Sequence, residues 1–258
     1  MFADIPGARI WYEDTGGDGV PIVLLHASTG SVAMWKHQLP AFAAAGYRCI
    51  AYDRRGHGRT ECDAFDVPPS EDLRGLADRL GLAAFHLLGT AAGGIVAFDF
   101  VLSHAGRVRT LTVANSIGGV QDADYLALQR RLRPSPEFDA LPPEVRELGP
   151  AYRAADPAGT QRWIDLEHAS RTTEEIKRPA SRNRVTFESL EGIRAPTLLI
   201  TGDADLYTPP PVLELFRQRI RGAQSVVLPN CGHSAYWEQP ELFNRTVLDF
   251  LSGAARSP

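Results

Sequence analysis

The chain is poor in the residues that build disulfide scaffolds, metal clusters and membrane spans. Cysteine occurs only three times among 258 residues, at positions 49, 62 and 231, which is too few and too dispersed for a disulfide framework or a clustered metal site. The odd count favours a reducing compartment. No run approaches the apolar length of a membrane span, and residues 1–6 lack the features of a signal peptide. We therefore expect a cytoplasmic protein without a metal.

Runs of like charge are also missing. The 27 basic and 31 acidic residues give a formal net charge of -4 and are spread along the chain, so we expect neither nucleic acid nor an anionic membrane as a partner. A small-molecule substrate with an apolar part fits this composition better. The length and the 44% hydrophobic content predict one sizeable domain with an insertion, and they leave a homodimer open.

Short apolar runs alternate with helical patterns in two parts of the chain. The expected strands are residues 9–13, 22–25, 48–52, 85–88, 110–114, 197–201 and 225–228. This alternation predicts an α/β fold, in which helices cover both faces of a mostly parallel sheet. Residues 119–188 are polar, rich in arginine and proline, and helical in pattern. We expect a core of residues 1–118 and 189–258 with an inserted helical cap at 119–188.

The most informative absence is a single hydroxyl group. Residues 87–94, Leu-Leu-Gly-Thr-Ala-Ala-Gly-Gly, have the G-x-S-x-G frame of a nucleophile elbow, but Ala91 stands where serine would be. Gly89 and Gly93 supply the small neighbours, between a buried strand and an apolar helix. A methyl group cannot attack a carbonyl, so the chain as written should not form an acyl-enzyme. On this pattern alone, a plain glycine-rich turn is the alternative.

An acid and a histidine follow two later strands. Asp203 and Asp205 come after residues 197–201, and His233 comes after residues 225–228. The order of nucleophile, acid and histidine is typical of one fold family. With the motifs at residues 26–30, 52–59 and 237–240, the chain resembles the α/β-hydrolase family over nearly its whole length. The resemblance implies a mostly parallel eight-stranded sheet, helices on both faces and an inserted helical cap.

The resemblance also implies roles for individual residues. Ala91 takes the nucleophile's place, His233 would be the general base, and Asp205 would orient the base. Asp203 is the competing acid. No metal, nucleotide or flavin cofactor is implied, because no ligand cluster or phosphate loop accompanies the motifs.

Two further groups of residues complete the expected site. The backbone N–H groups of Ser28 and Ala92 would form an oxyanion hole, although Ala27 replaces the glycine that is commoner in the first of these loops. His26 and His57 are interpreted as scaffold residues. Large aromatic residues near the sheet edge or in the cap are the candidate substrate contacts, in a largely apolar pocket: Trp35, Trp163, Tyr207 and Tyr236.

Ala91 leaves the function open between several interpretations. In the first, the chain is a serine hydrolase of a small carboxylic ester or lactone, held inactive because serine has been replaced by Ala91. Residues 113–115 are similar to enol-lactone hydrolases. Residues 231–238 are similar to carbon–carbon bond hydrolases of the same fold, from which Ser234 departs. If alanine is native, His233 and Asp205 would act only as a base in a cofactor-free oxygenase or lyase, or the fold would be a ligand-binding protein.

Overall fold

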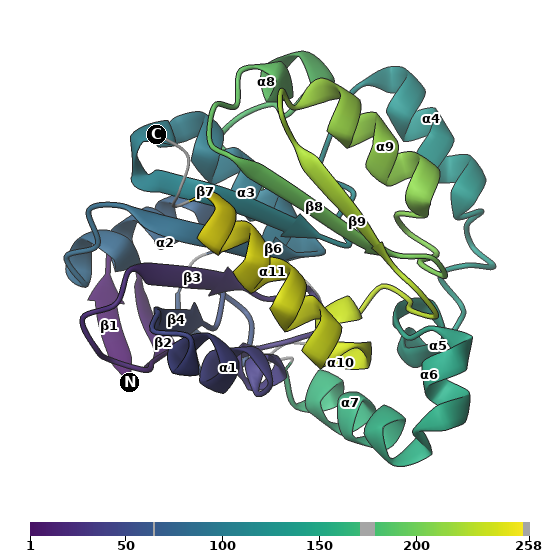
Figure 1. Ribbon diagram of the computed structural model, residues 1–258, viewed down its shortest axis with the longest axis horizontal. Coiled ribbons are helices and arrows are strands. Elements are labelled where there is room, and N and C mark those ends of the chain that lie inside the picture. Colours follow the sequence, from purple (N-terminus) through teal and green to yellow (C-terminus); the bar gives the residue numbers. More distant parts are fainter. Residues whose placement is uncertain (64, 171–178, 255–258) are drawn as a thin grey trace.

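Eight strands follow one another across a single sheet (Figure 1). The computed structural model describes residues 1–63, 65–170 and 179–254. In spatial order the strands are β1 Phe2–Ile5, β2 Ala8–Asp14, β4 Arg48–Tyr52, β3 Pro21–Leu25, β6 Phe85–Thr90, β7 Val108–Ala114, β8 Thr197–Gly202 and β9 Gln224–Leu228. From β4 to β9 all neighbours are parallel, whereas β1 and β2 form an antiparallel edge.

The expected mostly parallel sheet is confirmed, but the antiparallel strand β1 at its edge was not among the expected strand ranges. A ninth strand, β5 at Glu61–Cys62, pairs with β2, so the sheet has nine strands and not eight. This strand has only two residues and is half-exposed, which gives it no apolar pattern from which it could be predicted.

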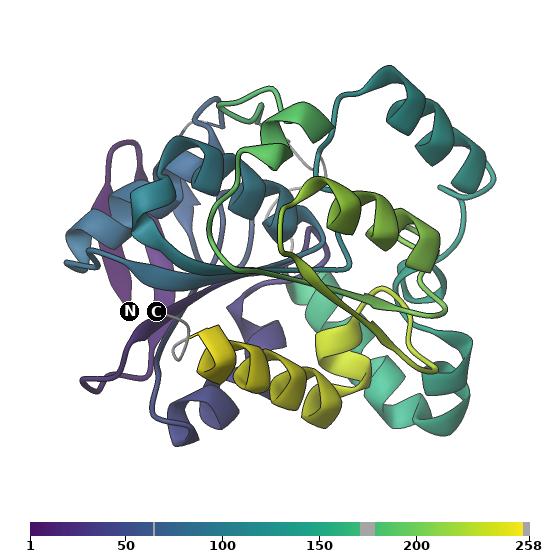
Figure 2. The same ribbon diagram turned by 45° about the horizontal axis from the view of Figure 1, so that its top comes forward.

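Helices cover both faces of the sheet (Figures 1 and 2). One face carries α1 and α11, and the opposite face carries α2, α3, α8 and α9. The bounds of these and the neighbouring short helices are η1 Val32–Trp35, α1 Gln38–Ala44, α2 Pro69–Arg79, α3 Ala92–Ser103, η2 Ala105–Arg107, α8 Phe187–Glu191, α9 Pro210–Arg219, α10 Ala235–Glu238 and α11 Pro240–Ala254.

The double cover explains why the central strands are apolar on both sides. Successive side chains of a strand point to opposite faces. In β3, Ile22 and Leu24 join the apolar cluster on the α1 and α11 face, whereas Val23 and Leu25 join the cluster on the α3 face. All four are almost fully buried. Both faces of the sheet therefore contribute to the core, and the carboxyl ends of its parallel strands are held rigidly.

Among the described residues, four helices lie between β7 and α8, in the region whose polar composition predicts a helical insertion. They are α4 Ala123–Leu132, α5 Pro143–Glu147, α6 Pro150–Ala155 and α7 Pro157–Ser170. Figure 1 shows α5, α6 and α7 grouped beside α10. Residues 171–178 of the expected cap lie outside the described residues, and its boundaries at 119 and 188 stay a prediction. Within residues 1–63, 65–170 and 179–254, no helix combines the length and apolarity needed to cross a bilayer.

Candidate active site

The turn between β6 and α3 has the strained backbone of a nucleophile elbow. Ala91 lies between them with φ +48° and ψ −115°, a conformation that residues other than glycine rarely adopt and that costs about 1–3 kcal/mol. The N–H of Ala91 donates to the carbonyl of Ala114 at 2.9 Å. The hydroxyl of Ser116 donates to the carbonyl of Ala91 at 2.6 Å. The end of strand β7 and the turn that follows it thus hold both the N–H and the carbonyl of the strained residue.

Glycine is required next to the elbow because other chain segments approach too closely. A Cβ atom on Gly93 would collide with the carbonyl of Leu25, and one on Gly89 would collide with the carbonyl of Gly93. The frame therefore serves the sharp turn from strand to helix and presents the side chain of residue 91 at the surface of a cavity.

His233 and Asp205 form a buried hydrogen-bonded pair. The Nδ1 atom of His233 lies 2.9 Å from each carboxylate oxygen of Asp205. The side chains are 5% and 0% exposed, respectively. Asp203, the competing acid, instead accepts a hydrogen bond from the backbone N–H of Cys231 at 3.1 Å. The structure thus brings His233 together with Asp205.

Several donors hold Asp205 as a carboxylate. It accepts hydrogen bonds from Asn115 Nδ2 at 3.0 Å and Thr208 Oγ1 at 2.6 Å, and from the backbone N–H of Tyr207 at 2.7 Å. Burial opposes ionisation, but the positive charge of His233 and these donors hold the pKa of Asp205 well below its usual value. An ionised Asp205 keeps the Nδ1 proton on His233 and leaves Nε2 free to act as a base.

Glu147, at the end of α5, joins the inserted helices to the histidine. Its carbonyl accepts the backbone N–H of His233 at 2.8 Å and that of Ser234 at 3.0 Å. Its carboxyl group is buried, and burial raises its pKa. Burial lowers the pKa of His233, but the negative charges of Asp205 and Glu147 outweigh this and raise it above its usual value. Sequence reasoning did not single out Glu147, because nothing in its local pattern distinguishes it from a surface acid.

Ser28 and Ala92, the expected oxyanion donors, line the same cavity as Ala91 and His233. Ala92 is the first residue of α3, so its N–H has no partner within the helix. Neither N–H donates to an acceptor within the described part of the chain. The carbonyl of Ser28 lies 3.2 Å from Nε2 of His57, a contact that can position this loop. The two N–H groups are therefore available to a substrate oxygen.

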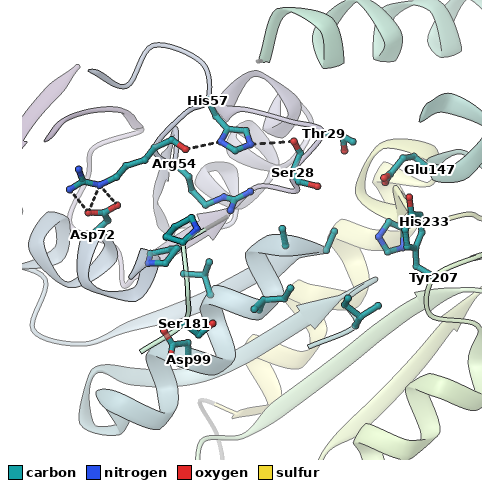
Figure 3. A pocket seen from close by; sticks show the side chains of 18 of the residues that line it. Ser28, Thr29, Arg54, His57, Asp72, Asp99, Glu147, Ser181, Tyr207 and His233 are labelled. Atoms are coloured by element: carbon teal, nitrogen blue, oxygen red, sulfur yellow. Dashed lines mark hydrogen bonds and ion pairs between the residues drawn. The ribbon is translucent and has the colours of Figure 1, made fainter. Parts of the chain in front are cut away.

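The cavity has a volume of about 330 Å³ and is lined by charged as well as apolar groups. Figure 3 shows His233, Glu147 and Tyr207 together on one side, with Arg54 and Asp72 across the cavity. The ring centroids of Tyr207 and His233 are 4.3 Å apart. A cavity of this size suits a small molecule.

The candidate aromatic contacts divide into one cavity residue and three core residues. Tyr207 lines the cavity. Trp35, Trp163 and Tyr236 do not: they are at most 1% exposed and belong to the apolar cluster on the α1 and α11 face. The structure does not place these three residues as substrate contacts, because their large apolar surfaces fill the core. Trp35, for example, packs against Tyr236 with the ring centroids 5.0 Å apart.

Comparison with known proteins identifies the family of this chain. A model of the alpha/beta hydrolase family matches residues 22–246. The chain is a member of the α/β-hydrolase family. The elbow, the acid and the histidine all fall within the matched residues, so the family's fold extends over the whole site.

This α/β-hydrolase has relatives of several activities. A 2-hydroxy-6-oxononadienedioate/2-hydroxy-6-oxononatrienedioate hydrolase of Burkholderia vietnamiensis is 30% identical over 276 residues, which cover 94% of this chain and 91% of that protein. A thermophilic esterase from Thermogutta terrifontis is 25% identical, with a TM-score of 0.80 and coverage of 98% and 99%. An enol-lactonase from Burkholderia xenovorans LB400 is 24% identical and shares the fold, with a TM-score of 0.77 and coverage of 98% and 100%.

Proposed function

We propose that this α/β-hydrolase cleaves a carbon–carbon bond beside a ketone in a small 2-hydroxy-6-oxo dienoic acid, with His233 activating a water molecule. The observation that carries the proposal is the meeting, at one cavity, of the buried Asp205–His233 pair and a methyl group at residue 91. The relative from Burkholderia vietnamiensis, whose name gives substrates of this class, supports the choice of bond.

The first step is attack of water on the ketone. The water oxygen bonds to the carbonyl carbon while one of its protons passes to Nε2 of His233. The ketone oxygen becomes an oxyanion, to which the N–H groups of Ser28 and Ala92 can donate. Asp205 stabilises the imidazolium that forms. No group on residue 91 is needed for this step.

The second step breaks the carbon–carbon bond. Before water attacks, the 2-hydroxy dienoate tautomerises to its 2-keto form, in which the hydroxyl proton has moved to the carbon beside the 6-oxo group. The oxyanion then collapses to a carboxylic acid, and the bonding electron pair passes to that departing carbon, where conjugation through the remaining double bond with the 2-keto group delocalises it. That carbon then takes the proton held by His233. One water molecule is consumed, and neither an oxidant nor a reductant is required.

A second candidate is hydrolysis of a small ester or lactone through an acyl-enzyme, which needs serine at residue 91. One observation favours it: Ala91 keeps the positive φ that lifts a nucleophile out of the sheet, a geometry that attack by water does not require. In enzymes of that kind, loss of the nucleophile lowers kcat by about 10⁶-fold. The chain as written would then bind its substrate without cleaving it.

The two candidates are separated by assaying the unchanged chain beside Ala91→Ser and His233→Gln. The substrates are 2-hydroxy-6-oxononadienedioate, followed by loss of its absorbance, and p-nitrophenyl acetate. We expect the unchanged chain to consume the dienoate and His233→Gln to be slower by about 10²–10⁴-fold, the usual contribution of a general base. We expect no covalent adduct of the unchanged chain by mass spectrometry.

Two other outcomes would replace the proposal. Turnover by Ala91→Ser alone, with an acetyl adduct after p-nitrophenyl acetate, supports the acyl-enzyme candidate. Binding of the dienoate without turnover in either form indicates a ligand-binding protein.

A further inference from the structure

Arg54 lines the cavity and has no carboxylate partner among the residues that the structure describes. Its Nε and Nη2 atoms are shielded from solvent and make no hydrogen bond within the described part of the chain. The adjacent Arg55 differs, because its guanidinium holds both carboxylate oxygens of Asp72 at 2.8–3.0 Å. Burial lowers the pKa of Arg54 to about 10, which still leaves it protonated at neutral pH. An uncompensated cation is costly to bury and is rarely retained for packing alone.

Tyr52 adds a second unsatisfied polar group at the same wall. Its side chain is fully buried, and its hydroxyl has no hydrogen-bond partner within the described residues. Tyr52 and Arg54 both line the cavity, two residues apart at the carboxyl end of β4. A guanidinium and a phenol hydroxyl together offer several donors and, at neutral pH, no competing negative charge.

The surroundings hold Arg54 in place without neutralising it. Its backbone N–H donates to Nε2 of His26 at 3.0 Å. Burial and the positive charge of Arg54 hold the pKa of His26 well below its usual value, so this neighbour stays neutral. Three acids line the same cavity. Asp72 is engaged by Arg55, Asp99 is engaged by Ser70 and Asn183, and Glu147 acts on His233 at the opposite side.

We propose that Arg54 and Tyr52 form a carboxylate subsite, which binds the acid end of the substrate. Figure 3 shows Arg54 across the cavity from His233. Planar guanidinium groups bind carboxylates through paired hydrogen bonds, and the tyrosine hydroxyl can donate a further one. The inference rests on the proposed function for the identity of the substrate. It narrows the substrate to a molecule that carries a carboxylate at one end and the bond to be broken at the other.

The test measures binding without turnover. The probes are 2,4-hexadienoate and its neutral amide, titrated by calorimetry against the unchanged chain, Arg54→Met, Arg54→Lys and Tyr52→Phe. Arg131→Met, at an exposed position on α4, is the matched control. We expect the unchanged chain to prefer the acid over the amide. Arg54→Met should weaken acid binding by about 10- to 100-fold, the scale of lost charge-assisted hydrogen bonds, and leave amide binding unchanged.

The other variants sharpen the result. Arg54→Lys should keep part of the preference because the charge remains, and Tyr52→Phe should lose about threefold to tenfold for the acid. Equal losses for acid and amide, or the same loss in Arg131→Met, would overturn the subsite. If Arg54→Met does not fold, an acid-to-amide ratio near one in the unchanged chain has the same meaning.

The outcome is independent of catalysis. A preference that depends on Arg54 without dienoate cleavage would refute the proposed function alone. Cleavage that depends on His233, with no acid preference, would refute the carboxylate subsite alone.

Discussion

The elbow at residue 91 and the Asp205–His233 pair differ in which parts of a hydrolase site they contain. At the elbow, the backbone keeps φ +48° and the close glycine contacts, but residue 91 carries only a methyl group. At Asp205 and His233, both the backbone and the side chains are in place, at 2.9 Å. The elbow is shaped by packing between β6, α3 and β3, so its form does not depend on a nucleophilic oxygen. The pair is a charged arrangement, and removing two charges from water costs free energy that its mutual hydrogen bonds and further donors must offset.

The largest expected effect comes from breaking the pair. Asp205→Asn removes the charge and allows the wrong tautomer of His233, so the dienoate turnover should fall by about 10³–10⁴-fold. Asp203→Asn is the matched control, because this acid contacts the backbone of Cys231 and not His233. Steady-state kinetics of both variants decide the point. Equal activity of the two variants would show that the pair is not catalytic.

Breaking the elbow should affect stability. In Gly93→Ala, the new Cβ meets the carbonyl of Leu25, so we expect a loss of about 1–3 kcal/mol or more in the free energy of unfolding. Gly106→Ala is the control, since no atom lies within 4 Å of a Cβ there. Urea denaturation measures both. A Gly93→Ala protein as stable as the control would contradict the packing account of the elbow.

The pH dependence of activity tests the protonation state of His233 in the Asp205–His233 pair. His233 must be neutral to accept a proton, and its folded-state pKa is raised, so activity should be lost as the pH falls through a midpoint above 6.5. Asp205 and Glu147 raise this pKa, while Arg133 lowers it. Glu147→Gln should therefore move the midpoint of kcat/KM to lower pH. An unchanged midpoint would show that Glu147 does not act on His233.

The smallest expected effect concerns the strain at residue 91. Ala91→Gly relieves an unfavourable positive φ but adds freedom to the unfolded chain, so we expect a change within about 1 kcal/mol. Ala154→Gly, exposed in α6, has no strain to relieve and should lose about 0.5–1 kcal/mol. Thermal unfolding compares them. A larger loss in Ala91→Gly than in Ala154→Gly would argue against strain at the elbow.

Short sequence motifs were enough to predict most of the fold and to single out Asp205 and His233. The elbow glycines and the strand ends before Asp205 and His233 are visible in the sequence because their geometry is set by a few adjacent residues. The alternation of apolar runs likewise predicted the parallel strands. The two-residue strand β5 was missed because its pairing with β2 is decided by tertiary contact and not by pattern.

The lining of the cavity was harder to predict. Trp35 and Trp163 are large aromatic residues of the kind that often contact substrates, yet the packing of α1, α7 and α11 places them in the core. Glu147 and Arg54 line the cavity, but the burial of a charged group is a property of the folded chain and leaves no mark on the local sequence. A residue that follows a strand can be recognised from its neighbours in the sequence. The residues that face it across the cavity come from distant parts of the chain and cannot be recognised in this way.

In the proposed reaction His233, and no side chain at residue 91, performs the chemistry. The most direct measurement is the single-turnover rate of 2-hydroxy-6-oxononadienedioate cleavage by excess unchanged chain, compared with His233→Gln at the same pH. We expect cleavage by the unchanged chain and a rate about 10²–10⁴-fold lower in His233→Gln. Equal rates in the two proteins, or no cleavage until serine is placed at residue 91, would contradict it.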